Sequence, residues 1–180
     1  MKPNITLMAE YVRECLDYNP ETGVLTWKNR PRNHFSSDWK WKGWNTRYSG
    51  KPAGTPASNG YLQIVFKPRF LQAHRLAWLI SSGKWPAFQI DHINGIKTDN
   101  RISNLREATH AENCMNLGLR KSNTSGVKGV FWHKVANKWA AAIGVKGKRL
   151  HLGLFEKIED ATDRIRLARE EYHADFANHG

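Results

Sequence analysis

The stretch that decides the fold runs from Gln89 to Asn113, QIDHINGIKTDNRISNLREATHAEN. Its first part, together with the preceding Phe88, has the composition of a short strand at residues 88–93, and the Asn94-Gly95 pair is a strong turn signal that ends it. Residues 102–106 predict a second short strand. The T-x-x-E spacing of Thr109 and Glu112 is that of a capping box, so a helix is expected to open there with Asn113 in its first turn. The segment therefore predicts strand, loop, strand and helix in that order.

Three side chains in this segment are of types that serve metal-assisted hydrolysis, in which a water is activated and developing charge is stabilised. His92 can accept a proton near neutral pH, which makes it the candidate general base. The Asp91 carboxylate and the Asn113 amide oxygen are hard ligands that suit Mg²⁺ or Mn²⁺. The alternatives are structural: a turn residue at Asp91, a packed histidine at His92 and an ordinary helix-start residue at Asn113.

The segment resembles the ββα-metal, or HNH, nuclease motif, and it is most similar to the phage homing-endonuclease branch with its pattern D-H-x-N-G…D-N-R…N-L-R…T…E-N. The resemblance implies a metal-dependent DNA endonuclease with one divalent ion, Mg²⁺ or Mn²⁺, that nicks DNA at each active site. It implies that Asn104 braces the loop and orients the base, and that Asp91 and Asn113 bind the ion. Many HNH nucleases have His at the last position, and Asn113 there argues against tight Zn²⁺ binding. The matching positions are Asp91, His92, Asn94, Gly95, Asp99, Asn100, Arg101, Asn104, Leu105, Arg106, Thr109, Glu112 and Asn113.

Upstream of this segment, His74-Arg75-Leu76 matches the helix that often precedes the motif in this branch. His74 and Arg75 are therefore possible site residues, although a histidine at such a position more often packs in a core. Arg101 and Arg106 are expected to contact DNA.

The charge of the chain predicts a polyanionic partner. Its 180 residues carry a formal net charge of +12. Residues 22–90 contain eleven Lys or Arg and one acid, and residues 119–155 contain eight Lys or Arg and no acid. Such clusters neutralise phosphates, so we expect double-stranded DNA as the partner, although charge alone does not separate DNA from RNA. No apolar run approaches the roughly 18 residues that a membrane span needs, so no membrane partner is expected.

The N-terminal region, residues 1–60, is expected to be basic and aromatic. A helix is predicted at 5–18, a turn at 19–23 and a strand at 24–27. Residues 28–60 look least ordered, and their tryptophans either cap the core or stack on nucleic-acid bases, whereas Lys40, Lys42 and Arg47 suit a phosphate backbone. The nuclease core is assigned to residues 61–118, with a strand at 60–66 and a helix at 71–82 that Gly83 ends.

A separate C-terminal module is predicted after a polar linker at residues 119–125. Three strands are expected in residues 126–180, at 127–133, 138–145 and 149–154, followed by a helix at about 158–177. Its apolar stripe should pack on the sheet through Ile158, Ala161, Ile165, Ala168 and Tyr172.

This module is similar to the AP2 DNA-binding domain, in which a three-stranded sheet enters the major groove with a helix behind it. The matching residues are Ser125 to Val130, Lys138 to Ala141, Leu152 to Phe155, and Ala161. Phe131 and His133 stand where plant members carry arginines, which weakens the expectation of strict sequence specificity. The alternative is a protein-interaction or stabilising domain. The residues expected to contact DNA are Lys128, His133, Lys134, Lys138, Arg149 and His151.

Together these features predict an α+β protein: a ββα-metal HNH core with an N-terminal helix and strand region and a C-terminal AP2-like sheet and helix. Two competing functions stay open, a DNA-binding, transcription-factor-like protein with a decayed nuclease site and an RNA-directed nuclease. The two cysteines are far apart, which indicates reduced thiols, and we expect a phage protein that acts on DNA in the host cytoplasm.

Overall fold

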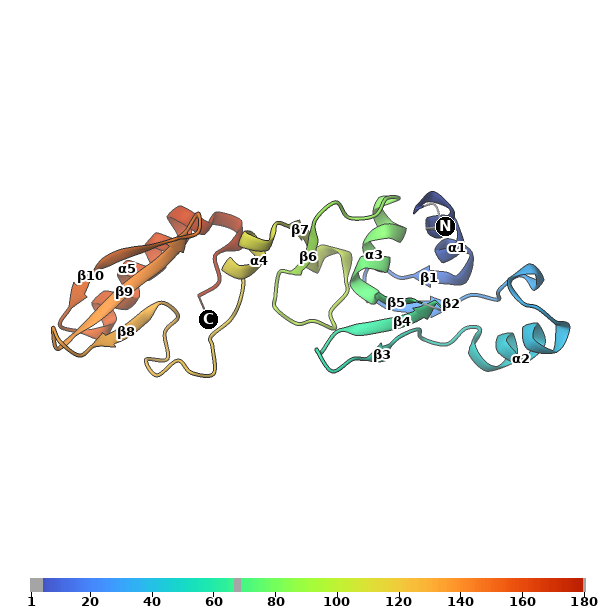
Figure 1. The fold of residues 1–180 in the computed structure, drawn as a ribbon, viewed down its shortest axis with the longest axis horizontal. Helices are drawn as coiled ribbons and strands as arrows, with labels where there is room; N and C mark the ends of the chain where they lie inside the picture. The colour runs from blue at the N-terminus through green and yellow to red at the C-terminus, as the bar shows by residue number, and fades with distance from the viewer. Residues whose placement is uncertain (1–4, 67–68, 180) are drawn as a thin grey trace. The chain divides into compact units, whose positions relative to one another are not determined.

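A computed structural model describes residues 5–66 and 69–179, and the chain divides into two compact units, Met1–Glu107 and Ala108–Gly180 (Figure 1). This division falls inside the predicted nuclease core, because it leaves Asp91 and His92 in the first unit and Asn113 in the second. The sequence-based boundaries at 60, 118 and 125 stay predictions.

The first unit begins with helix α1 (Ile5–Cys15), which ends three residues earlier than predicted. Leu16–Tyr18 instead form strand β1, paired antiparallel with β2 (Leu25–Trp27). The reason lies in the following turn, where the Asn19 side-chain oxygen accepts hydrogen bonds from the backbone amides of Glu21 and Thr22. This turn reverses the chain at once, so the last predicted helical residues lie extended.

Residues 28–60, predicted to be the least ordered part, contain a short 3₁₀ turn η1 (Arg32–His34), helix α2 (Asp38–Tyr48) and strand β3 (Thr55–Pro56). The prediction was wrong because α2 lacks an apolar stripe: none of its residues is buried. The Ser37 hydroxyl caps its first turn by accepting from the amide of Lys40. Hydrogen bonds and aromatic contacts to Arg30 then hold the helix in place.

A three-stranded antiparallel sheet in the order β3-β4-β5 carries the rest of the first core. Strand β4 (Leu62–Phe66) confirms most of the predicted strand, whereas β5 (Arg69–Gln72) takes the first two residues predicted as helix. Helix α3 (Ala73–Ser82) follows and ends at Gly83, whose φ of 81° is the left-handed conformation that glycine adopts readily. The buried side chains of this core come from α1, β1, β2, β4 and α3, among them Val12, Leu16, Leu25, Ile64, Leu76 and Leu79.

The deciding segment forms strand β6 (Gln89–His92), a 3₁₀ turn η2 (Ile102–Asn104) and strand β7 (Leu105–Ala108), which pairs with β6. The second strand begins three residues later than predicted. Helix α4 (His110–Met115) then opens with the predicted capping box, in which Thr109 and Glu112 exchange hydrogen bonds. The predicted order of elements is confirmed.

The second unit contains the predicted sheet and helix: β8 (Val130–His133), β9 (Lys138–Val145) and β10 (Lys148–Phe155) form an antiparallel sheet in the order β10-β9-β8. Helix α5 (Ile158–His173) contacts all three strands (Figure 1). It ends before the predicted 177 and is followed by the 3₁₀ turn η3 (Ala174–Phe176). Ala161, Ile165 and Ala168 pack against the sheet as predicted, but Tyr172 is exposed and the neighbouring His173 is buried instead.

The cysteines are both free; Cys15 is buried and Cys114 is exposed. Within the described part of the chain, none of the helices has the length and apolarity required to cross a lipid bilayer.

Candidate active site

Strand β6 brings Asp91 and His92 into the interior of the first unit. The two residues are 5% and 4% exposed. The Asp91 carboxylate is held by Arg106 on β7, whose Nε and terminal amino group lie 2.9 and 2.8 Å from Oδ2. Arg106, expected to contact DNA, therefore lies in a mostly buried ion pair that neutralises Asp91.

His92 contacts the side chain of Asn100, a residue that is 2% exposed. The imidazole Nε2 lies 3.2 Å from the amide Oδ1. Because an amide oxygen only accepts hydrogen bonds, this contact assigns the ring hydrogen to Nε2. Burial is the main cause that lowers the pKa of His92, so the ring is neutral at pH 7 and able to accept a proton.

His74 at the start of α3 and Tyr61 pack against the His92 ring. The His74 and His92 ring centroids are 5.1 Å apart at 80°, and the Tyr61 ring lies 5.0 and 5.8 Å from the two histidines. Burial lowers the pKa of His74 to about 3, so this ring is uncharged near neutral pH. Its Nδ1 is buried without a hydrogen-bond partner among the described residues. Arg75 points elsewhere and donates to the backbone oxygen of Phe88.

Asn104 spans the loop that follows His92. Its Oδ1 accepts from the backbone amide of Asn94 at 3.0 Å, and its Nδ2 donates to the backbone oxygen of Asp99 at 2.8 Å. The side chain thus ties both ends of the loop together, which is the bracing that the motif implies. Arg101, another expected DNA contact, is engaged in this loop by two hydrogen bonds to the Asp99 carboxylate. Those bonds hold the pKa of Asp99 well below its usual range.

The turn between β1 and β2 contacts the backbone around Asn100 and holds it in place. The Tyr18 hydroxyl donates to the backbone oxygen of Asn100 at 2.7 Å, and the backbone oxygen of Pro20 accepts from Ile102 at 3.2 Å. Gly23 has a φ of 75°, and a Cβ there would meet the Arg101 nitrogen at 2.5 Å. Only glycine allows this close approach, so the turn and the Asn100 segment are fitted to each other.

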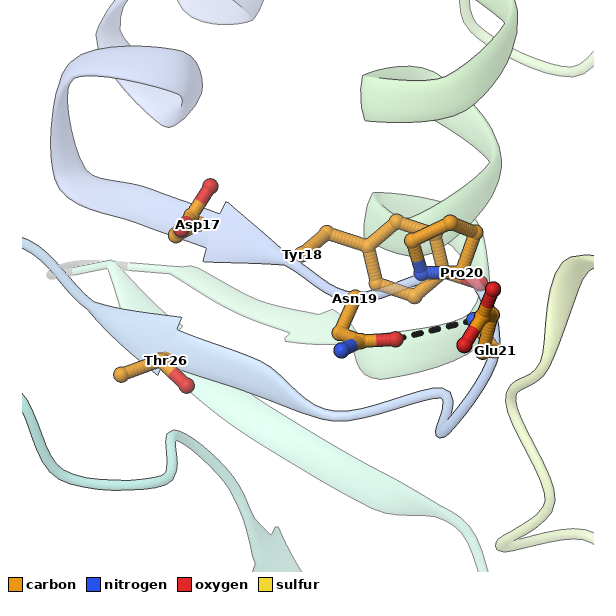
Figure 2. A pocket seen from close by; sticks show the side chains of 6 residues that line it. All are labelled: Asp17, Tyr18, Asn19, Pro20, Glu21 and Thr26. Atoms are coloured by element: carbon orange, nitrogen blue, oxygen red, sulfur yellow. Dashed lines mark hydrogen bonds between the residues drawn. The ribbon is translucent and has the colours of Figure 1, made fainter.

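The outer side of the same turn is an open hollow of about 600 Å³, lined by Asp17, Tyr18, Asn19, Pro20, Glu21 and Thr26 (Figure 2). Two of its lining side chains are carboxylates and none is a cation. A phosphate group would be repelled there, so this hollow is not a candidate for nucleic-acid binding.

Asn113, the last residue of the predicted site, lies on helix α4 in the second unit. Its backbone amide donates to the Thr109 oxygen at 3.0 Å, in the first turn as expected. The structure thus gathers Asp91, His92 and Asn104 in one unit and puts Asn113 on the helix that follows it in sequence.

Four of the predicted DNA-contacting residues of the second unit lie on one face of its sheet. His133 pairs with Lys138, Arg149 with Gly144 and His151 with Ala142, and these positions alternate with Ala141 and Ile143, which pack in the core with α5. The Arg149 guanidinium lies 4.8 Å from the centroid of the Phe131 ring. Lys134 follows β8 directly and is exposed, while Lys138 forms an ion pair with Glu156 at 2.8 Å.

Lys128 has a different environment from the other predicted DNA contacts. Its ammonium donates to the backbone oxygens of Met115, Leu117 and Asn178. Burial and the nearby Arg169 lower its pKa to about 8. These bonds tie three segments of the second unit together, so Lys128 has a structural role, and its contact with DNA stays a prediction.

Sequence reasoning gave Asn100 no role, although it is part of the D-N-R match. Its side chain reaches His92 across eight residues of an irregular loop, and no residue spacing predicts such a contact. Tyr18 and Gly23 were missed for a related reason, because their partners are more than 75 residues away in sequence.

Known proteins resemble this chain in the region that contains the HNH-like segment. The model of a family described as HNH endonuclease matches residues 71–115. Protein 3.8 of Escherichia phage T7 is 34% identical over 118 residues, which cover 65% of this chain and 94% of that protein. An uncharacterized HNH endonuclease of Acanthamoeba polyphaga mimivirus is 34% identical over 110 residues, covering 59% of this chain and 56% of that one. Among solved structures, the HNH homing endonuclease I-HmuI, solved in a study of its DNA binding and cleavage, is 20% identical in sequence to this chain. The match has a TM-score of 0.39 and covers 88% of this chain and 85% of that chain.

Proposed function

The chain belongs to the HNH endonuclease family, and we propose that it hydrolyses phosphodiester bonds of double-stranded DNA with one divalent ion, Mg²⁺ or Mn²⁺, at each site. The observation that carries the proposal is the contact of His92 Nε2 with Asn100 Oδ1, next to the buried carboxylate of Asp91. A base of fixed tautomer beside a carboxylate is what metal-assisted hydrolysis of a phosphodiester requires.

His92 is the general base in this proposal. With the ring hydrogen on Nε2, the nitrogen that takes the proton from the attacking water is Nδ1. Asn100 and Asn104 are positioning residues: the first fixes the tautomer and orientation of the imidazole, and the second fixes the loop that carries Asn100. Tyr61 and the neutral ring of His74 shield one side of the imidazole from water.

Asp91 and Asn113 are the residues that would hold the divalent ion. Within residues 5–66 and 69–179, no group of three or more His, Cys, Asp and Glu side chains is placed to hold a metal ion. A donor set of one carboxylate and one amide oxygen fits Mg²⁺ or Mn²⁺, which take their other ligands from water and phosphate, better than it fits Zn²⁺. When bound, the ion would supply positive charge to the phosphate and to the departing 3′ oxygen.

The outer face of the sheet in the second unit is proposed to bind the same DNA, in the manner of an AP2-like domain. His133, Lys138, Arg149 and His151 share this face, and beyond Lys138 the central strand presents small residues to it, Ala140, Ala142 and Gly144. Such a surface suits the major groove. A single active site makes a nick the expected product, and the viral relatives favour a phage protein that acts in the host cytoplasm.

Incubating supercoiled plasmid with the protein tests the reaction and its substrate. We expect nicked circles with Mg²⁺ or Mn²⁺ and none with EDTA, and an RNA of matched length should stay intact. DNA binding without cleavage at any metal concentration would support the decayed, DNA-binding alternative. Preferential cleavage of the RNA would support the RNA-directed alternative.

Binding of Mn²⁺, followed by electron paramagnetic resonance, tests the ligands. Asp91→Ala and Asn113→Ala should each weaken binding at least about tenfold, and the double variant should bind no more tightly than the weaker single variant, because the two residues hold one ion. An Asn113→Ala protein that binds Mn²⁺ as tightly as the wild type would remove Asn113 from the site.

A further inference from the structure

Helix α2 has one face that is anchored to the first unit through Arg30. The indole Nε1 of Trp41 and the amide of Asn45 both donate to the backbone oxygen of Arg30, at 2.9 and 3.0 Å. The Arg30 guanidinium lies 4.7 Å from the centroid of the Trp44 ring and 4.8 Å from that of Phe35. These contacts fix the orientation of the helix, and with it the direction in which the opposite face points.

The opposite face is basic and aromatic, and it makes no contribution to the core. Trp39 is 80% exposed, which is unusual for the largest apolar side chain on a helix that is otherwise anchored by hydrogen bonds. Lys40, Lys42 and Arg47 are exposed as well, with Lys42 on one flank of Trp39 and Lys40 and Arg47 on the other. Gly43 lies between Trp39 and Arg47 at four-residue spacing, and a Cβ there would meet nothing within 4 Å. Among the described residues of the first unit, no packing explains the tryptophan or the glycine.

The stretch of chain that carries α2 has charges almost all of one sign. Residues 22–90 hold eleven Lys or Arg and a single acid, Asp38, and that acid is paired with Arg32. The Arg47 guanidinium lies 5.5 Å from the centroid of the Tyr48 ring, which keeps it on the helix surface. The surface is complementary to a polyanion and not to a second copy of this chain, because a copy would present the same positive charge.

We propose that the outer face of α2 is a second DNA-contacting surface, distinct from the sheet of the second unit. Lys40, Lys42 and Arg47 contact phosphates of the duplex, Trp39 packs against the sugars of the adjoining groove wall, and Gly43 lets the backbone of the duplex approach the helix. The inference rests on the proposed function, since it takes the DNA substrate from it, and it adds the place where the first unit holds that DNA.

Fluorescence anisotropy of a labelled 30-base-pair duplex in EDTA tests the proposal without cleavage. We expect Lys40→Ala, Lys42→Ala and Arg47→Ala together to raise Kd at least about tenfold. The triple variant should also reduce the slope of log Kd against the logarithm of the salt concentration by about 2 to 3. The control variant Lys84→Ala, Lys157→Ala and Arg166→Ala removes the same charge from exposed positions elsewhere and should leave the slope within about 1 of the wild type. Circular dichroism should be unchanged, because no residue of α2 is buried.

Variants of Trp39 test the aromatic contact with DNA independently of the positive charges. Trp39→Ala should raise Kd roughly tenfold, whereas Trp39→Phe, which keeps an aromatic ring, should stay within about threefold of the wild type. Equal losses in the two triple variants, or a Trp39→Ala protein with unchanged Kd, would overturn the proposal. These outcomes are distinct from failure of the proposed function, in which the wild type itself would neither bind nor nick the duplex. Concentration-dependent self-association lost in Trp39→Ala, with duplex affinity intact, would assign the face to a second copy and would also overturn it.

Discussion

The Nε2 of His92 lies 3.2 Å from the Oδ1 of Asn100, and this contact links the predicted base to a part of the chain far from the HNH segment. The backbone of Asn100 is held by the Tyr18 hydroxyl and is packed against Gly23. The orientation of the imidazole therefore depends on the turn between β1 and β2 (Figure 2), which lies outside the family match at residues 71–115.

Removing the acceptor on Asn100 should slow cleavage without weakening DNA binding. We expect Asn100→Ala to lower kcat about 10- to 100-fold, because the His92 ring loses the partner that fixes its tautomer. Asn100→Asp keeps an oxygen acceptor and should retain more activity. The measurements are single-turnover nicking rates and duplex Kd in EDTA. Equal activity of the Ala variant and the wild type would show that Asn100 does not position the base.

Gly23 offers a test of the supporting turn with a matched control. Gly23→Ala places a Cβ 2.5 Å from the Arg101 nitrogen, whereas Gly50 has nearly the same φ, 76° against 75°, with nothing within 4 Å of its Cβ position. In both variants an alanine must adopt the left-handed conformation, which lowers the free energy of unfolding by about 1 kcal/mol. Only Gly23→Ala must also displace the backbone at Arg101, which lowers it by about a further 2 kcal/mol. We expect a lower Tm and slower nicking for Gly23→Ala than for Gly50→Ala. Equal Tm values for the two variants would contradict the close packing.

The burial of His74 predicts loss of stability in acid. Its pKa is about 3 in the folded protein and near its ordinary value of 6.5 when unfolded. Between these values the unfolded chain binds a proton that the folded chain does not, so unfolding becomes easier as the pH falls from 6.5 towards 3. The contribution reaches about 3 kcal/mol at pH 4. In a His74→Gln protein, Tm should fall less between pH 7 and 4.5 than in the wild type, and parallel curves would show that His74 is not the responsible group.

Comparing variants of Lys128 and Lys134 tests whether Lys128 stabilises the second unit while Lys134 acts only at the surface. Lys128→Ala leaves the backbone oxygens of Met115, Leu117 and Asn178 without their shared donor, so the second unit should lose about 1 to 3 kcal/mol of stability. Lys134 is exposed, and Lys134→Ala should leave Tm unchanged while weakening DNA binding. Thermal unfolding of both variants checks this. A Lys128→Ala protein as stable as Lys134→Ala would contradict the structural role.

The sequence predicted the elements whose determinants are local. The capping box of Thr109 and Glu112, the turn at Asn19 and the three strands of the second unit each depend on residues within a few positions of one another. Helix α2 was missed because hydrogen bonds to Arg30 replace the apolar stripe by which a helix is recognised. The motif supplied Asp91, His92, Asn104 and Asn113 as candidates, but the partners Arg106, Asn100 and Tyr18 became evident only once the chain was folded.

The most direct test of the account compares the wild type with His92→Ala on supercoiled plasmid in Mg²⁺ and Mn²⁺, with duplex affinity measured in EDTA for both proteins. We expect His92→Ala to lose at least about 100-fold in nicking rate while its Kd for the duplex stays within about twofold, because general-base catalysis contributes on that order and the basic surfaces are unaltered. Metal-dependent nicking by His92→Ala at the wild-type rate would contradict the assignment of this histidine as the catalytic base.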